Sequence, residues 1–247
     1  MSLSGREIFR EYDQYGVVSV YEDGQRRILN FGGEDEQSCA LKDDPSDLQH
    51  EYTRAMLLVL LFIEPRRVLS LGLGAGAINS CLHHRFPKLQ QRVVELRPLV
   101  IETARRFFQL PIGKRLRVES MDAGQFLAAP VEERVDLILS DIYDADGMDR
   151  QQIGFDFLER CAEHLKPKGW LVLNCWHEDE NSELINRLSV WFSDVRTTRT
   201  QDGNWIVLAG KVPVERSSAQ LRRDLKTLEQ RLGFSLQPAF KRLRNLI

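Results

Sequence analysis

The stretch VLSLGLGAG at residues 68–76 is the part of the sequence that decides the fold. Residues 68–71 are mostly apolar and predict a short buried strand, and the glycines at positions 72, 74 and 76 predict a tight turn into a helix over 77–86. The same order of strand and helix continues, with further strands expected at 92–95, 115–119, 135–140 and 170–175. Apolar strands that alternate with helices predict a doubly wound, mostly parallel α/β sheet that is covered on both faces.

The connections between these strands complete the predicted sheet. Helices are expected over 98–108, 122–128, 155–165 and 181–192. The Lys-Pro-Lys-Gly sequence at 166–169 is expected to end the third of these helices before the fifth strand begins. Two last strands, at 195–200 and 205–209, are separated by a Gln-Asp-Gly-Asn turn and predict an antiparallel edge. The expected sheet therefore has seven strands, and it resembles the sheet of methyltransferases.

The segments on either side of this sheet predict smaller units. Residues 17–31 form two β-like runs around the turn Asp23-Gly24, which predicts a hairpin, and a third strand is expected at 37–41. Ser46 and Gln49 have the spacing of a capping box and predict a helix start. Leucines at helical spacing predict an amphipathic helix over 219–232. We therefore expect an N-terminal β-hairpin domain at 1–45, a Rossmann-like nucleoside-binding catalytic domain at 46–212 and a basic helical tail at 213–247.

The charge of the chain argues against a general nucleic-acid binder. The 247 residues contain 34 Lys+Arg and 36 Asp+Glu, so the chain lacks the basic field of a general nucleic-acid binder. The charge is uneven, because residues 211–247 hold nine Lys/Arg against three Asp/Glu. We interpret these tail charges as the solvated face of a packed helix rather than as an RNA site.

The distribution of apolar residues and cysteines bears on the compartment. The longest apolar run, residues 55–63, is half as long as a membrane span requires, and the N-terminus has no signal-peptide pattern. The cysteines at 39, 81, 161 and 175 are widely spaced, which suits neither disulfides nor a zinc ribbon. We therefore expect a cytoplasmic protein with no membrane segment and no metal. The pair His83-His84 is interpreted as a surface pair, because no companion ligands accompany it.

The ends of the predicted strands carry residues suited to a nucleoside. Ligands of open α/β sheets bind beyond the carboxyl ends of the strands. The glycine turn lets a nucleoside pass close to bare backbone, and Glu95 at the end of the second strand can accept hydrogen bonds from a ribose diol. Nicotinamide dinucleotide enzymes and enzymes of adenosyl-sulfonium cofactors share these two features. Asp122 favours the second class, since it can bind the adenine amino group, cap the next helix, or do both.

Acidic residues gather after the fourth strand. Asp141, Asp144 and Asp146 lie within six residues of one another. Their mutual repulsion is relieved by a cationic ligand, while the plainer interpretation is a solvated loop. Trp176 follows the fifth strand and is expected either to form part of the pocket wall or to lie at its rim.

The chain resembles the polyamine aminopropyltransferases, the spermidine synthase family, over about residues 12–210. The stretches that carry the resemblance are LSLGLGAG at 69–76, VVELRPLVIETARRFF at 93–108, MDAGQFL at 121–127 and DLILSDIYDADG at 136–147. The sequence ILNFGG before Gln37, and the run Gln49-His50-Glu51, also resemble the family. The Asp-x-x-Asp pattern of Asp141 and Asp144 is the most discriminating part, since methyltransferases share the rest.

The resemblance implies transfer of an aminopropyl group from decarboxylated S-adenosylmethionine to a polyamine, leaving methylthioadenosine. Asp141 would be the catalytic acid/base. The nucleoside would be bound by a set that includes the ribose-binding Glu95 and the adenine-binding Asp122: Gln37, Gly72, Gly74, Gly76, Glu95, Asp122 and Ala123. The amine would be held by Asp144 and Asp146, with His50 or Glu51 at its far end. The family also implies a homodimer.

Three departures from the family pattern leave other functions open. Ala75 stands where the family's glycine loop carries an acid near the aminopropyl amine, and Gln49 replaces a tyrosine. A proline-rich gate after Asp144 is replaced by the sequence Ala-Asp-Gly-Met-Asp at 145–149. The loss of the acid weakens discrimination against intact S-adenosylmethionine. The alternatives are therefore an S-adenosylmethionine-dependent methyltransferase and a catalytically inactive nucleoside-binding homologue.

Overall fold

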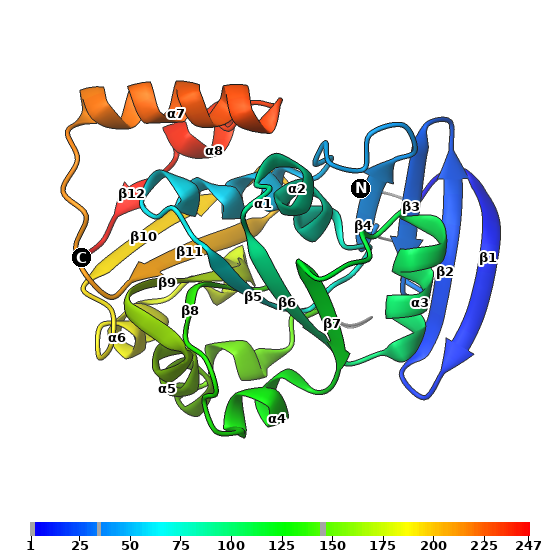
Figure 1. Cartoon of the computed structure of the whole chain (residues 1–247), viewed down its shortest axis with the longest axis horizontal. Coiled ribbons are helices and arrows are strands. Elements are labelled where there is room, and N and C mark those ends of the chain that lie inside the picture. The colour runs from blue at the N-terminus through cyan, green and yellow to red at the C-terminus, as the bar shows by residue number, and fades with distance from the viewer. Residues whose placement is uncertain (1–2, 34–35, 144–146) are drawn as a thin grey trace.

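Two β-sheets organise the molecule, which is described by a computed structural model over residues 3–33, 36–143 and 147–247 (Figure 1). The N-terminal sheet is antiparallel, with the order β1-β2-β3-β4. Its strands are β1 (Arg6–Asp13), β2 (Gly16–Asp23), β3 (Arg26–Asn30) and β4 (Ser38–Leu41). The predicted hairpin around Asp23-Gly24 is confirmed as β2 and β3, which pair from Ser19↔Asn30 to Asp23↔Arg26. The strand β1 was not placed from the sequence, because its burial does not alternate and its pairing with β2 has a register shift between Glu7 and Phe9.

The larger sheet has the order β12-β10-β11-β9-β8-β5-β6-β7. Its strands are β5 (Arg67–Leu71), β6 (Gln90–Glu95), β7 (Leu116–Ser120), β8 (Val135–Ser140), β9 (Leu165–Trp176), β10 (Asp194–Arg199), β11 (Asn204–Gly210) and β12 (Arg244–Asn245). β5 pairs in parallel with both β6 and β8, so the chain order reverses there. Such a reversal opens a crevice at the carboxyl ends of the strands. β11 is antiparallel to β9 and β10, which confirms the predicted antiparallel pair. The edge strand is β12, which pairs with β10, so the described sheet has eight strands rather than the seven expected, because the tail returns to add a short strand.

Helices cover both faces of this sheet (Figure 1). One face is covered by α1 (Glu51–Met56) with its 3-10 continuation η1 (Leu57–Leu61), α2 (Ala77–Arg85), α7 (Ser218–Leu232) and α8 (Gln237–Lys241). The other is covered by α4 (Ala123–Ala128), α5 (Phe155–His164) and α6 (Ser182–Leu188). α3 (Pro98–Phe107) lies between the sheets, and the 3-10 turns η2 (Arg150–Ile153) and η3 (His177–Asp179) lie in loops. In the described part of the chain, no helix is long and apolar enough to cross a membrane.

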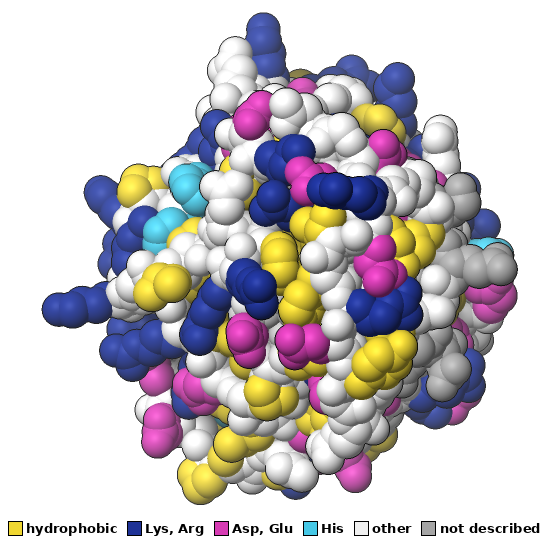
Figure 2. Space-filling view, turned by 90° about the vertical axis from the view of Figure 1, so that its right-hand side faces the viewer, with side chains coloured by type: hydrophobic (Ala, Val, Ile, Leu, Met, Phe, Trp, Pro, Cys, Tyr) yellow, Lys and Arg dark blue, Asp and Glu magenta, His cyan; other side chains and the backbone are white. Residues whose placement is uncertain are grey.

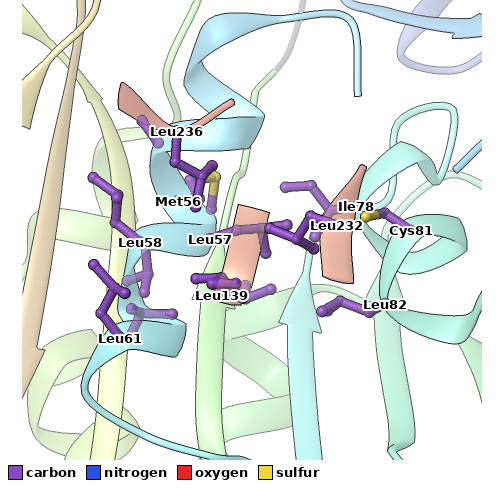
Figure 3. Close-up of a cluster of buried hydrophobic side chains, with 14 of the residues drawn as sticks. Met56, Leu57, Leu58, Leu61, Ile78, Cys81, Leu82, Leu139, Leu232 and Leu236 are labelled. Atoms are coloured by element: carbon purple, nitrogen blue, oxygen red, sulfur yellow. The ribbon is translucent and has the colours of Figure 1, made fainter. Parts of the chain in front are cut away.

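The tail is part of the core. Leu225, Leu228 and Leu232 of α7 are buried with residues of η1 and α2. Figure 3 shows Leu232 and Leu236 among Met56, Leu57 and the α2 side chains. The predicted amphipathic helix is confirmed, with a capping box formed by Ser217 and Gln220. The expected division of the chain at 45/46 and 212/213 stays a prediction.

A second interface joins the two sheets. Val18, Val20 and Leu29 of the N-terminal sheet are buried against Val100 and Phe108 in and after α3. This packing places Phe31, after β3, and Gln37, before β4, beside the carboxyl ends of the large sheet. On the outer side of the N-terminal sheet, Figure 2 shows Lys/Arg and Asp/Glu side chains interspersed with small groups of hydrophobic side chains.

Two local predictions were wrong. The helix α1 begins at Glu51 with His50 as N-cap, rather than at a capping box, because Ser46 bonds to Asp44 and Gln49 to the Asp47 carbonyl. The strand β9 begins at Leu165 rather than at residue 170. A register shift between Val135 and Leu137 in the pairing with β8 accommodates residues 166–169, whose proline has no N–H for a regular ladder.

Candidate active site

A pocket of about 500 Å³ lies in the crevice where the order of the strands reverses. One side is formed by residues at the carboxyl ends of the large sheet: Gly72, Gly74, Glu95, Asp122, Asp141 and Asn174. The other side is formed by the β3–β4 loop and the start of α1: Phe31, Glu36, Gln37, Ser38, His50 and Tyr52. The pocket therefore depends on the packing of the N-terminal sheet against the large one.

The glycine turn connects β5 to α2 and supports the floor of the pocket. Gly72 has φ 92°, and a Cβ placed there would lie 2.2 Å from the backbone oxygen of Asp141. Gly76, the N-cap of α2, has φ 75°, and its Cβ would lie 2.4 Å from Leu110. Both positions require glycine for conformation and for space. Gly72 and Gly74 line the pocket as predicted, whereas Gly76 supports the turn from outside the lining.

Glu95 is held by two backbone amides. Its Oε2 accepts from Leu73 N at 3.0 Å and its Oε1 from Arg97 N at 2.9 Å. Burial raises the pKa of this carboxyl, and the two amide hydrogen bonds oppose that rise. Arg97 itself binds Asp13 through two hydrogen bonds of 2.9 Å. Glu95 is therefore oriented with its remaining lone pairs available to a ribose diol.

Asp122 fulfils the helix-capping expectation and also lines the pocket. Its Oδ1 accepts from Gln125 N at 2.8 Å, which makes it the N-cap of α4. Ala123 lines the pocket beside it. The apolar side chains of Leu96 and Met121 lie in the same part of the lining. These two were not predicted, although each directly follows a strand, and they offer the faces of a flat base an apolar surface.

Asp141 lies at the junction of the two sides of the pocket. Desolvation raises the pKa of its carboxyl to about 6, against hydrogen bonds from Asn174 and Tyr52 that lower it. Asn174 Nδ2 donates to Asp141 Oδ1 at 2.8 Å. A carboxylate with a pKa near 6 is mostly ionised at neutral pH and basic enough to take a proton.

A chain of hydrogen bonds fixes the amide of Asn174. Asn204 Nδ2 on β11 donates to Asn174 Oδ1 at 3.0 Å, so the NH2 group of Asn174 faces Asp141. Asn204 N in turn donates to Thr200 Oγ1 at 3.0 Å. Gln152 Nε2 donates to the Asn174 carbonyl at 2.9 Å. Asn174 lies in the strand expected at 170–175 and Asn204 in the turn expected before the last strand, and the sequence alone did not give either of them a role.

Two tyrosines complete the surroundings of Asp141. Tyr52 on α1 lies beside Asp141 and lowers the pKa of that carboxyl, and its hydroxyl is 3.4 Å from the backbone carbonyl of Gln37, so its one O–H is shared between two acceptors. Tyr143 OH donates to the Asn174 carbonyl at 3.3 Å, and its ring meets Trp176 edge-on with centroids 5.7 Å apart. Burial raises the pKa of both hydroxyls, so they remain donors at neutral pH. Tyr52 was missed. The sequence did offer one signal, a tyrosine three residues after Gln49, which itself stands where the family has a tyrosine.

The structure separates the predicted amine-binding residues. His50 is 7% exposed and lines the pocket, and burial beside Arg26 lowers its pKa to about 4. Glu51 lies elsewhere: its carboxylate accepts from Gln201 N at 2.8 Å and pairs with Arg242 of the tail. A role in binding the far end of the amine therefore stays a prediction for His50, and no contact in the structure supports that role for Glu51. Asp144 and Asp146 lie outside the described residues, while Gln37 and Trp176 line the pocket, and nucleoside binding by Gln37 stays a prediction.

Comparisons with known proteins point to one family of enzymes. Residues 49–201 match the model of the spermine/spermidine synthase domain. A polyamine aminopropyltransferase of Chromobacterium violaceum is 32% identical over 233 residues, which cover 92% of this chain and 89% of that protein. An eEF1A lysine and N-terminal methyltransferase homolog of Drosophila melanogaster is 28% identical over 181 residues, which cover 69% of this chain and 27% of that protein. A probable spermidine synthase from Corynebacterium glutamicum superimposes with a TM-score of 0.75 at 20% identity, covering 91% of this chain and 88% of the other.

Proposed function

Because the chain belongs to the spermine/spermidine synthase family, we propose that it is a transferase that moves an aminopropyl group from decarboxylated S-adenosylmethionine to a polyamine. One observation carries the proposal: Asp141, a carboxylate with a pKa of about 6, shares a pocket with the nucleoside-type residues Glu95 and Asp122. A base for an amine and a binding site for an adenosyl group are what this reaction requires.

The charge of the pocket supports the decarboxylated donor. The acids among its described lining residues are Glu36, Glu95, Asp122, Asp141, Asp149 and Asp202. Among the same residues the one guanidinium, that of Arg97, is already bound to Asp13. A carboxylate on the donor would therefore face acids without a free cation to pair with. A donor that carries only a sulfonium and an ammonium meets attraction instead.

The residues of this chain account for the steps of the transfer. The acceptor amine arrives protonated, and Asp141 attracts it and takes its proton, which frees the nitrogen lone pair. The nitrogen then bonds to the propyl carbon attached to sulfur, and the C–S bond breaks with its electron pair going to sulfur. The products are the extended polyamine and neutral methylthioadenosine. Asn174 and Tyr52 hold the Asp141 carboxylate in place, so the protein contributes mainly by positioning the two reactants.

A second candidate function is methyl transfer from intact S-adenosylmethionine. Two observations favour it: Ala75 in the glycine turn, and the methyltransferase homolog that matches 69% of the chain. The third candidate, a nucleoside-binding homologue without catalysis, is favoured by Gln49 and by the changed sequence at 145–149.

One experiment separates the three candidates. The thermal unfolding midpoint is measured with methylthioadenosine, S-adenosylhomocysteine and both forms of S-adenosylmethionine. Aminopropyl transfer predicts the largest rise with decarboxylated S-adenosylmethionine and methylthioadenosine. Larger rises with the two carboxylate-bearing ligands would favour methyl transfer. No rise with any of them would favour the inactive homologue.

We further propose a cytoplasmic homodimer of three parts, at 1–45, 46–212 and 213–247, with no nucleic-acid ligand and no bound metal. The cysteines support a reducing compartment, because all four are free and buried, and burial raises the pKa of each thiol. Light scattering of the purified chain tests the oligomeric state, and a mass near that of one chain would rule out the dimer.

A further inference from the structure

A buried cluster on the N-terminal side of the pocket is not used by the proposed mechanism. Glu36, Cys39 and His50 each place a ligand-type atom within 4.8 Å of the others. Glu36 is 9% exposed and His50 is 7% exposed, and both line the pocket. Glu36 Oε2 pairs with the Arg26 guanidinium and lies 3.7 Å from His50 Nε2. The cluster is therefore a built wall of the pocket and not a surface feature.

Two buried polar side-chain atoms of this cluster lack a hydrogen-bond partner. Among the described residues, Glu36 Oε1 and His50 Nε2 are buried and have no partner. Buried polar atoms are nearly always paired, because an unpaired one loses its hydration without compensation. His50 is neutral at pH 7, since its pKa is lowered to about 4, so one of its ring nitrogens is an acceptor. Glu36 Oε1 is an acceptor whichever ring nitrogen of His50 carries the hydrogen, so the cluster calls for a ligand rich in donors.

The chemistry around the cluster favours an ammonium group over a metal ion. A protonated primary amine carries three N–H donors and no acceptor, which matches a carboxylate and a neutral imidazole. A divalent ion held by this cluster would need the thiolate of Cys39 as its third ligand, and burial raises the pKa of that thiol.

We propose that Glu36 and His50 form a subsite for the protonated primary amine of a ligand in this pocket. The glycine turn offers that amine no carboxylate, because Ala75 is buried against the N-terminal sheet, in the cluster of Val18, Val20 and Leu29. Ser38, two residues after Glu36, lies directly over the turn: a Cβ placed on Gly74 would be 3.6 Å from Ser38 Cβ. The segment that covers the turn thus provides the acid.

The inference rests on the proposed function, and its test separates the amine from the nucleoside. Dissociation constants of decarboxylated S-adenosylmethionine and methylthioadenosine are measured by calorimetry for the native chain, Glu36→Gln and Glu36→Asp. The two ligands share the nucleoside, and only the first carries an amine. The matched control is Glu22→Gln, which removes an acid that pairs with Lys42 on the same sheet. The KM for putrescine is measured alongside.

If the subsite binds the amine of the donor, Glu36→Gln should lower the affinity for decarboxylated S-adenosylmethionine at least tenfold and the affinity for methylthioadenosine less than twofold. Glu36→Asp should recover part of the lost affinity. An acceptor-amine subsite predicts a tenfold rise in the KM for putrescine with the donor affinity unchanged. The control leaves all three values within twofold.

Three results would overturn the subsite. The first is that neither dissociation constant nor the KM for putrescine changes more than twofold in Glu36→Gln. The second is an equal loss of affinity for both nucleoside ligands, and the third is stoichiometric binding of Zn²⁺ alone that depends on Glu36. If the native chain binds neither nucleoside ligand, the proposed function fails and the subsite fails with it. If the native chain binds both, and Glu36→Gln binds both as tightly with an unchanged KM for putrescine, only the subsite fails.

Discussion

The nucleoside side and the amine side of the pocket are built in different ways. On the nucleoside side, backbone amides of Leu73 and Arg97 hold Glu95, and Asp122 caps the helix that it precedes. Each of these hydrogen bonds joins residues that are at most 22 positions apart along the chain. On the amine side, Asp141 is held by Tyr52 and Asn174, which come from distant segments. The first side is therefore set by local turns, and the second by packing between elements.

This difference means that the amine side can change while the nucleoside side stays constant. A substitution on the amine side is expected to alter the reaction and leave adenosyl binding intact. A substitution in the glycine turn is expected to damage both sides, because the turn touches Asp141 directly.

Asp141→Asn gives the largest expected effect on the amine side alone. The amide cannot take a proton, so turnover is expected to fall by roughly 10³-fold or more. The affinity for methylthioadenosine is expected to stay within a few-fold, since Glu95 and Asp122 are untouched. Steady-state kinetics and calorimetry check the two halves of this prediction. Turnover that survives would show that Asp141 is not the base.

Gly72→Ala is expected to break both sides together. The new Cβ would lie 2.2 Å from the Asp141 oxygen at a φ of 92°, so the free energy of unfolding should fall by about 3 kcal/mol. Methylthioadenosine binding should weaken as well. Gly24→Ala is the control, because Gly24 also has positive φ, 57°, but has nothing within 4 Å of its Cβ position. Equal chemical denaturation curves for the two variants would contradict the close approach.

Asn204→Ala tests the hydrogen-bond chain behind Asp141. In the native chain, activity should fall as pH drops through about 6, because a protonated Asp141 cannot accept a proton. Loss of Asn204 frees Asn174 to turn away, which removes a bond that lowers the pKa of Asp141. The acidic limb of kcat/KM should therefore move to higher pH, with activity at pH 6 reduced several-fold.

The matched control for Asn204→Ala is Asn181→Ala, which removes the N-cap of α6 away from the pocket. It should lower stability and leave the acidic limb where it is. If the acidic limb of the kcat/KM profile does not shift in Asn204→Ala, the hydrogen-bond chain from Asn204 through Asn174 does not act on Asp141.

Arg242→Ala gives the smallest expected effect. Arg242 pairs with Glu51, and because both side chains are partly exposed the pair should contribute at most about 1 kcal/mol to the free energy of unfolding. The KM for the amine should change less than twofold if Glu51 is a structural residue. A large rise in that KM would show that Glu51 takes part in binding the amine.

The same division explains what the sequence could predict. The large sheet, the glycine turn, Glu95 and Asp122 follow from periodicity and from short spacings, and the structure contains them. Tyr52, Asn204 and Glu36 could not be found that way, because each acts on a residue brought near only by the packing of α1, β11 and the N-terminal sheet. The failed capping box has the same origin, since Asp44 and Asp47 compete for Ser46 and Gln49.

The position of the tail in the core has a consequence for synthesis on the ribosome. Leu225, Leu228 and Leu232 cover η1, and α8 contacts α1, which carries Tyr52 and follows His50. A nascent chain that has reached residue 210 holds every strand of the nucleoside side but leaves that apolar helix uncovered. In that chain α1 can already contact β9 and β11, and its contact with α8 forms only after residues 211–247 have left the exit tunnel. Until then the exposed leucines of η1 are a surface for chaperones or for aggregation.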